Sequence, residues 1–220
     1  DPPPPRKQNV VPFNGLENVS PALQLTECLL SQYNDLQIDG EHMMFIAPDE
    51  GATERVVFLA SLFGVNIGMF YKRRDYTKIV DGMNPIIAHE FCGGSVENMD
   101  VVVVDDMISS GGSMLDVARQ LKLRGARRVF LYATFGLFTN GFDKLDKAYA
   151  EGWFDKLFCT NLTYQKIELL EKEYFYSIDM TRYVAAIIDR LNQGDPMQEL
   201  MTPAQRIKET VQKFKEGRKF

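Results

Sequence analysis

The fold is decided by residues 101–113, which read VVVVDDMISSGGS. Four consecutive valines are typical of a strand that is buried on both faces of a parallel sheet. Two aspartates and a loop of small residues follow, and residues 113–124 then place apolar side chains on one face of a helix. This order predicts one unit of an α/β sheet. We expect its aspartates at the carboxyl end of the strand, where open parallel sheets bind their ligands.

The loop after this strand has the composition of a phosphate-binding site. Its hydroxyls and backbone N–H groups can surround a phosphate at the positive end of the next helix, and its glycines permit close approach and positive φ angles. Asp105 and Asp106 can accept hydrogen bonds from sugar hydroxyls or attract a divalent cation. A short match of this kind also fits an ordinary turn, and only the complete order of elements favours the site. The predicted loop consists of Ser109, Ser110, Gly111, Gly112 and Ser113.

Helices and strands alternate over most of the chain. Predicted helices cover residues 20–33, 56–64, 113–124, 145–153 and 181–194. Predicted strands cover residues 42–48, 65–71, 99–104, 127–136, 156–162 and 175–180, with a short extended stretch near 84–89. The alternation predicts a doubly wound, mainly parallel sheet. Residues 72–84 are strongly charged without a clear period, which predicts an exposed loop.

The two ends of the chain differ from its middle. Residues 1–12 begin with DPPPPRKQ, and a proline run of this kind indicates a stiff linker from an amino-terminal domain that the sequence does not include. We expect residues 13–194 to form the α/β domain. Residues 195–220 are polar and charged, which predicts a solvated helical extension.

Composition excludes several classes of protein. The net charge is −5 and no basic tract occurs, which argues against a nucleic-acid partner. No stretch approaches the roughly 18 to 20 consecutive apolar residues of a membrane-spanning helix, and no secretory signal is evident, so we expect a cytoplasmic protein. Cys28, Cys92 and Cys159 lack the spacing of a disulfide framework or zinc site. His42 and His89 have no ligand partners at helical spacing and are interpreted as structural.

The central segment resembles the ribose-phosphate signature of the type I phosphoribosyltransferase family, which implies that fold and a ribose-5-phosphate site. Three further segments resemble ribose-phosphate diphosphokinases. Residues 47–55, APDEGATER, are similar to the pyrophosphate loop of that family. Residues 70–84 are similar to its flexible catalytic loop, and residues 134–141, TFGLFTNG, to its Thr-His-Gly-hydrophobic-Phe-Ser-Gly segment. The similarity runs from about residue 13 to residue 192, which is the carboxyl-terminal domain of the family and a little more.

The resemblance implies roles for the matched residues. Lys72 and Arg74 stand at the positions of the catalytic lysine and arginine. Asp49, Gly51 and Arg55 match the loop that holds the pyrophosphate or ATP phosphates, and Asp49 is also a candidate metal ligand. From the local sequence alone, the basic residues are better interpreted as a solvated turn, and Asp49 suits a helix cap equally well; the flanking matches reverse the preference for the basic residues.

The implied reaction moves a diphosphoryl group from ATP to the anomeric hydroxyl of ribose 5-phosphate, with release of AMP, in nucleotide biosynthesis. Its implied cofactor is Mg²⁺, and its implied state is a homo-oligomer. Two alternatives stay open. One is a phosphoribosyltransferase that consumes phosphoribosyl diphosphate, although no base-binding segment is evident. The other is a non-catalytic regulatory relative.

The chain also departs from the family pattern. Ala52 replaces a glycine of the pyrophosphate loop, and Phe135 replaces the usual histidine. Ser109, Ser110 and Gly111 stand where Asp-Thr-Ala is more frequent. None of these changes removes a charged catalytic group. The amino-terminal domain, which supplies much of the ATP-binding surface in the family, is not among these 220 residues.

Overall fold

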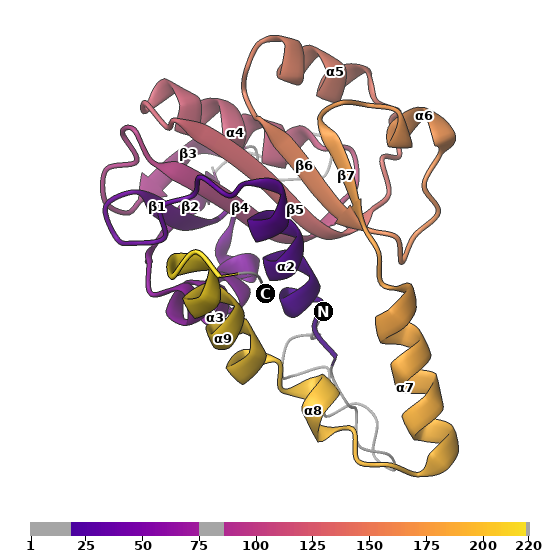
Figure 1. Ribbon diagram of the computed structural model, residues 1–220. Coiled ribbons are helices and arrows are strands. Elements are labelled where there is room, and N and C mark those ends of the chain that lie inside the picture. Colours follow the sequence, from indigo (N-terminus) through magenta and orange to yellow (C-terminus); the bar gives the residue numbers. More distant parts are fainter. Residues whose placement is uncertain (1–18, 75–85, 219–220) are drawn as a thin grey trace.

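One mainly parallel sheet forms the centre of the computed structural model, which describes residues 19–74 and 86–218 (Figure 1). Within these residues the sheet has seven strands in the order β3-β2-β1-β4-β5-β6-β7. Only β3 is antiparallel to its neighbour, β2. The strands are β1 (Met43–Ala47), β2 (Asn66–Arg74), β3 (Ile86–Cys92), β4 (Asp100–Ile108), β5 (Arg128–Gly136), β6 (Lys156–Thr160) and β7 (Phe175–Ile178). The predicted doubly wound, mainly parallel sheet is confirmed.

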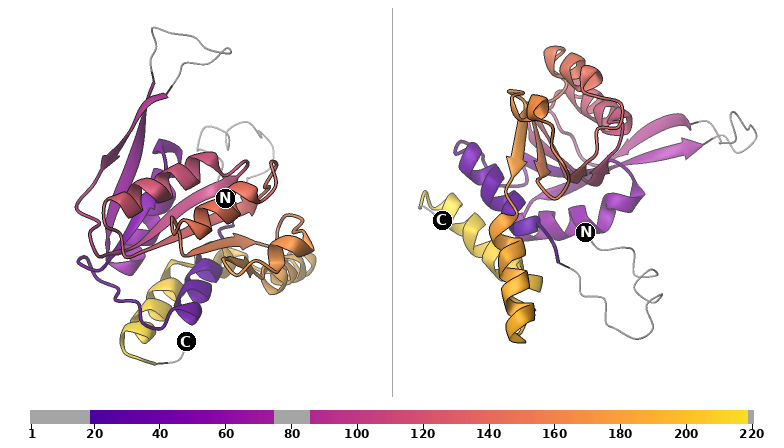
Figure 2. Two further views of the ribbon diagram at one scale, coloured as in Figure 1. Left: turned by 90° about the horizontal axis from the view of Figure 1, so that it is seen from above. Right: turned by 90° about the vertical axis from the view of Figure 1, so that its right-hand side faces the viewer.

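Helices cover both faces of the sheet (Figure 2). The longer helices are α2 (Ala22–Gln32), α3 (Thr53–Phe63), α4 (Gly112–Leu123), α5 (Asp143–Ala150), α7 (Thr181–Gln193) and α9 (Ala204–Lys215). The short ones, which the sequence did not indicate, are η1 (Glu50–Ala52), α6 (Ile167–Leu170) and α8 (Gln198–Met201). Each predicted helix and strand is present, with its ends shifted by a few residues.

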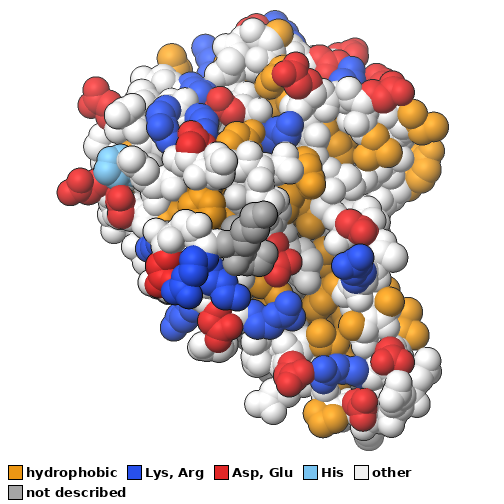
Figure 3. Space-filling view, viewed as in Figure 1, with side chains coloured by type: hydrophobic (Ala, Val, Ile, Leu, Met, Phe, Trp, Pro, Cys, Tyr) orange, Lys and Arg blue, Asp and Glu red, His pale blue; other side chains and the backbone are white. Residues whose placement is uncertain are grey.

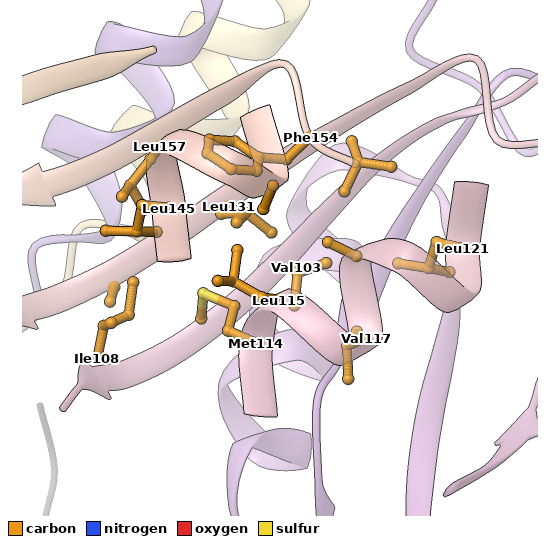
Figure 4. Packing of buried hydrophobic residues seen from close by; sticks show 14 of the residues in the cluster. Val103, Ile108, Met114, Leu115, Val117, Leu121, Leu131, Leu145, Phe154 and Leu157 are labelled. Atoms are coloured by element: carbon orange, nitrogen blue, oxygen red, sulfur yellow. The ribbon is translucent and has the colours of Figure 1, made fainter. Parts of the chain in front are cut away.

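The valines of β4 divide between two buried clusters. Val101 and Val103 pack with α4 and α5, whereas Val102 and Val104 pack with α2 and α3. Figure 4 shows Val103 within the first of these clusters. All four side chains are buried, because alternate residues of a strand face opposite sides of the sheet and both sides are covered here.

The chain reverses its direction across the sheet between β1 and β4. From β1 it passes through α3 to β2 on one side, and later returns to β4, which lies on the other side of β1. From β4 it continues through α4 to β5. In open α/β sheets this reversal opens a crevice at the carboxyl ends of the two strands. The topology therefore places any ligand site beside the ends of β1 and β4.

Strand β2 is longer than its sequence predicts. The backbone of residues 72–74, expected in a loop, belongs to β2 and pairs with β3 from Lys72 opposite His89 to Arg74 opposite Ile86. Figure 2 shows the two strands as a ribbon that extends beyond the rest of the sheet. The prediction was wrong because antiparallel pairing stabilises this backbone, whereas the local charges only indicated exposure. Residues 75–84 of the predicted loop lie outside the described part of the chain.

The two longer helices near the carboxyl terminus, α7 and α9, differ in burial. We expected residues 195–220 to be solvated, but Ile207, Thr210 and Val211 of α9 are buried against α2 and α3. Their spacing of three and four places them on one face of the helix. In contrast, α7 has no buried residue, and hydrophobic side chains along it are exposed, including Ile188 and Leu191 (Figure 3). None of the described helices combines the length and apolar character that crossing a membrane requires.

Candidate functional site

A pocket of about 160 Å³ lies at the carboxyl ends of β1 and β4, where the topology favours a ligand site. It joins Asp49, which follows β1, to Asp105 of β4 and to the loop before α4. The other lining residues are Met107, Ile108, Ser109, Ser110, Gly111, Gly112, Ser113 and Met114. The structure thus brings together all five residues of the predicted phosphate loop with two of the predicted carboxylates.

The phosphate loop, residues 109–113, ends in a helix start that suits an anion. Gly111 has φ of +79°, a left-handed conformation that favours glycine, and it directly precedes the first residue of α4. No side chain among the described residues caps the first turn of α4. The backbone N–H groups of a first helical turn have no partners within the helix, so they can donate to phosphate oxygens.

The segment after β5 forms hydrogen bonds with the backbone at the start of the phosphate loop. Leu137 N–H donates to Ile108 O at 2.9 Å, and Thr139 N–H donates to Ser109 O at 3.0 Å. The hydroxyls of Ser109 and Thr139 lie 3.4 Å apart. The sequence prediction missed Thr139 as an individual residue. Its only signal was the resemblance of residues 134–141 to a family segment.

The two aspartates of the acidic pair have different surroundings, although their side chains lie close to each other. Asp105 lines the pocket on the α4 side, whereas Asp106 is exposed on the side of α3, where its Oδ2 lies 3.9 Å from Arg55 Nη2. The two carboxyl groups still interact, because a hydrogen bond with the Asp106 side chain contributes to the raised pKa of Asp105. The role of both carboxylates in binding ribose hydroxyls stays a prediction.

Asp105 has the most perturbed carboxyl group of the site. Burial, together with the negative charges of Asp106 and Asp49, raises its pKa from 3.8 to about 7. The N–H of Asp106 donates to Asp105 Oδ1 at 2.8 Å, which opposes the rise in pKa. This concentration of negative charge favours a proton, a cation or a hydrogen-bond donor beside Asp105.

Asp49 both caps a short helix and lines the pocket. Its side chain caps η1, because Asp49 Oδ1 accepts a hydrogen bond from Gly51 N–H at 3.1 Å. The same residue lines the pocket. Gly51 and Arg55 do not line the pocket, although both belong to the segment that follows β1. Ala52 is buried in the core beneath α3, so the methyl group that distinguishes it from glycine fills space there.

Lys72 and Arg74 are described only by their backbone, which belongs to β2. In the parallel register Ala47, the last residue of β1, pairs with Met69. Lys72 therefore lies three residues beyond the end of β1, at the same edge of the sheet as Asp49. Phe135, the other departure from the family pattern, pairs with Met107 of β4 and is half-buried.

The carboxylates of the site suit a hard cation that arrives with phosphates. No group of three or more His, Cys, Asp or Glu residues in the described part of the chain could hold a metal ion by itself. Mg²⁺ commonly uses one or two carboxylates together with substrate phosphates and water. Asp49 and Asp105 line one pocket with a phosphate loop, and their mutual repulsion raises the pKa of Asp105. This donor set fits Mg²⁺ bound together with a phosphorylated ligand.

Comparisons with known proteins agree with the fold. Ribose-phosphate pyrophosphokinase of Vibrio parahaemolyticus is 30% identical over 164 residues, which are 73% of this chain and 49% of that protein. The pyrophosphokinase of Pyrococcus furiosus is 33% identical over 136 residues, which cover 61% and 44% of the two chains. The chain thus spans about half the length of the curated relatives it matches.

A solved structure and a family model extend the comparison. Phosphoribosylpyrophosphate synthetase from Mycobacterium smegmatis has a TM-score of 0.64 at 20% identity, over 79% of this chain and 51% of that one, and shares the fold. The family model described as "Phosphoribosyl transferase domain" matches residues 15–166, more than half of the chain. These residues contain β1 to β6, the phosphate loop and both carboxylates of the pocket. The chain therefore belongs to the phosphoribosyl transferase domain family.

Proposed function

We propose that this chain is the ribose-5-phosphate-binding part of a ribose-phosphate diphosphokinase. The reaction transfers a diphosphoryl group from ATP to the anomeric hydroxyl of ribose 5-phosphate and releases AMP and phosphoribosyl diphosphate. One observation carries the proposal: a single pocket joins a phosphate loop at a helix start to the carboxylates of Asp49 and Asp105. The relatives named as pyrophosphokinases support the choice among the reactions of the family.

The size of the pocket supports a sugar phosphate rather than a whole nucleotide. Its volume of about 160 Å³ is below the roughly 300 to 1,000 Å³ that sites for drug-sized ligands occupy. In this proposal the 5-phosphate binds the N–H groups of residues 111–113, and the ribose hydroxyls donate to Asp105. The ATP site then requires surface outside this pocket, which agrees with a chain that spans half of its relatives.

Lys72 and Arg74 supply positive charge to the diphosphoryl group in this proposal. Phosphoryl transfer needs mostly positioning and neutralisation of charge that shifts toward the leaving oxygen. The support is topological, because the backbone at Lys72 lies beyond the end of β1 at the edge of the sheet that holds Asp49.

Asp49 and Asp105 are the residues that would hold Mg²⁺ in this site. When bound there, the ion would supply positive charge to neutralise and orient phosphate oxygens. The proposal also includes a homo-oligomer and a cytoplasmic location, and both rest on the resemblance to the family.

The proposal is tested by measuring AMP formed from ATP and ribose 5-phosphate, with and without Mg²⁺. The natural full-length protein and residues 1–220 are assayed in parallel, and ribose-5-phosphate binding to each is followed by calorimetry. We expect Mg²⁺-dependent AMP from the full-length protein and ribose-5-phosphate binding by both. Release of diphosphate that depends on phosphoribosyl diphosphate and a base would instead identify a phosphoribosyltransferase. Binding of both substrates without product would identify a non-catalytic relative.

The role of the basic residues is tested with Lys72→Ala in the full-length protein. We expect at least a hundredfold loss of turnover with nearly unchanged ribose-5-phosphate affinity, since the loss concerns the transition state (about 3 kcal/mol or more). Lys208→Ala on α9 is the matched control, because Lys208 is exposed and remote from the pocket. Unchanged turnover in Lys72→Ala contradicts the assignment.

A further inference from the structure

A second pocket, of about 240 Å³, lies between α4 and α5. Its apolar surface comes from Leu115, Ala148 and Trp153, and this tryptophan is the only one in the sequence. Trp153 is half-buried and packs against the hydrophobic core. Pockets that bind small molecules commonly combine such apolar and aromatic surface with a few charged groups. This α4–α5 pocket therefore offers a place for an aromatic or other planar group.

Basic side chains line the same pocket, although the whole chain has a net charge of −5. The guanidinium carbon of Arg119 lies 5.5 Å from the centre of the Trp153 ring. Lys144 and Lys147 contribute from α5, and Asp116 is the single acidic residue among the lining residues described. Glu151 also lies near the pocket, since its Oε1 is 3.8 Å from Lys147 Nζ, so the three basic groups exceed the two acidic groups by one charge. This part of the surface therefore attracts anions.

The α4–α5 pocket is connected to the phosphate loop. Gly112 lines both pockets. A Cβ atom at Gly111 would lie 3.8 Å from Leu115 Cδ1 and 4.0 Å from Leu145 Cδ2, so both leucines reach the loop backbone. Figure 4 shows these leucines in one packed cluster with Ile108, the residue before the loop. Leu115 thus contacts the loop and also lines the α4–α5 pocket.

We propose that the α4–α5 pocket binds a small aromatic anion, of the aryl phosphate or aryl carboxylate class, and that its occupancy changes ligand affinity at the phosphate loop. The aromatic group lies on the apolar surface beside Trp153, and the anion pairs with Arg119, Lys144 and Lys147. Gly112 lines both pockets, and Leu115 lines the α4–α5 pocket and contacts the phosphate loop. These two residues therefore transmit the change. The proposal that this pocket binds an anion depends only on the α4–α5 pocket, whereas the proposal that occupancy changes affinity at the phosphate loop rests on the proposed function.

Binding is measured with phenyl phosphate as the probe and Trp153 fluorescence as the readout, because no other tryptophan contributes. Inorganic phosphate and phenol serve as the charge-only and ring-only probes. We expect a saturable change with phenyl phosphate at concentrations where neither control probe responds. Arg119→Gln and Lys144→Gln should each weaken binding about tenfold, as expected for the loss of one charge-assisted contact. Lys208→Gln on α9 is the control and should bind as the unchanged protein does.

Two results would overturn the site: equal responses to inorganic phosphate and phenyl phosphate, or unchanged affinity in both Arg119→Gln and Lys144→Gln. Circular dichroism of each variant establishes that it is folded. The two substitutions lie on different helices, so one local disturbance cannot produce both losses.

Coupling is measured by titrating ribose 5-phosphate with and without saturating phenyl phosphate. We expect at least a fivefold change in ribose-5-phosphate affinity, within the usual range of allosteric coupling. In Arg119→Gln the same change should require about tenfold more phenyl phosphate. An effect that needs no more phenyl phosphate in Arg119→Gln than in the unchanged protein indicates direct competition at the phosphate loop and overturns the coupling. If ribose 5-phosphate does not bind under either condition, the proposed function and the coupling both fail, while the fluorescence result for the α4–α5 pocket stands.

Discussion

Two strand, loop and helix units meet at the candidate site, and they use their helix starts differently. In the β4 unit Gly111 is left-handed, and among the described residues no side chain caps α4. In the β1 unit Asp49 caps η1 through Gly51, and Ala52 is buried. The β4 unit therefore keeps its N–H groups for a ligand, whereas the β1 unit satisfies one of them with a carboxylate of its own. The helix start after β4 can thus attract an anion, whereas the carboxylate at the helix start after β1 can attract a cation.

The largest effect is expected from Gly111→Ala. A left-handed conformation disfavours alanine, and strain of about 1–3 kcal/mol would be relieved by moving the phosphate loop. We expect about a hundredfold loss of ribose-5-phosphate affinity by calorimetry. The matched control is Gly64→Ala, at the end of α3 in the β1 unit, where φ is +70° and the space for a methyl group is open. It should lower stability but keep the affinity, and equal losses of affinity would break the comparison.

Asp105→Asn should stabilise the protein at alkaline pH. The raised pKa means that the folded state holds a proton which the unfolded state releases near pH 4, so stability falls as the pH rises from about 4 to 7. Removing the charge should add about 2 kcal/mol to the free energy of unfolding at pH 8, after allowance for partial exposure. Urea unfolding at pH 4 and pH 8 measures this. Asp195→Asn, exposed beyond α7, is the control, and a pH-independent gain would contradict the charge explanation.

Asp49→Ala should lower the free energy of unfolding, in contrast to Asp105→Asn. It removes the cap that Asp49 provides to η1, and loss of such a cap costs about 1 kcal/mol. The free energy of unfolding in urea at pH 7 should fall by this amount, while Asp49→Asn, which retains a capping oxygen, should remain nearly as stable as the unchanged protein. Equal stability of the alanine and asparagine variants would show that the cap has no energetic importance.

Ala52→Gly restores the glycine of the family pattern and should have the smallest effect. The change removes a buried methyl group and increases backbone freedom before α3, at a cost of about 0.5–1 kcal/mol. Ribose-5-phosphate affinity should not change, because Ala52 does not line the pocket. Altered affinity would mean that the β1 unit also determines how tightly the sugar phosphate binds, which would contradict the assignment of anion binding to the β4 unit.

Much of the site could be predicted because its signals are local. The valines, the aspartates and the small-residue loop are consecutive in sequence, and the structure brings Asp105 and residues 109–113 to one pocket. Asp105 and Asp106, which the prediction treated as a pair, do interact, since Asp106 raises the pKa of Asp105, although only Asp105 lines the pocket. The recognition of the phosphoribosyltransferase family from residues 101–113 is confirmed by the family match.

Other features depend on contacts between distant segments. Strand β2 extends to Arg74 because β3 pairs with it, and one face of α9 is buried because α2 and α3 cover Ile207 and Val211. The α4–α5 pocket has no signal in the sequence, since Arg119 and Trp153 belong to separate elements. Charge and polarity along the chain indicated exposure in the first two cases, and tertiary packing overrode them.

The hydrogen bonds behind the phosphate loop also fix the direction of its peptide dipoles. The carbonyl groups of Ile108 and Ser109 point toward the segment after β5, where the N–H groups of Leu137 and Thr139 bind them. In a trans peptide the N–H points away from the carbonyl, so the N–H groups of Ser109 and Ser110 point to the other side. Residues that do not line the pocket thereby orient positive dipole ends away from β5, and the polarity of the loop depends on a segment outside the helix start.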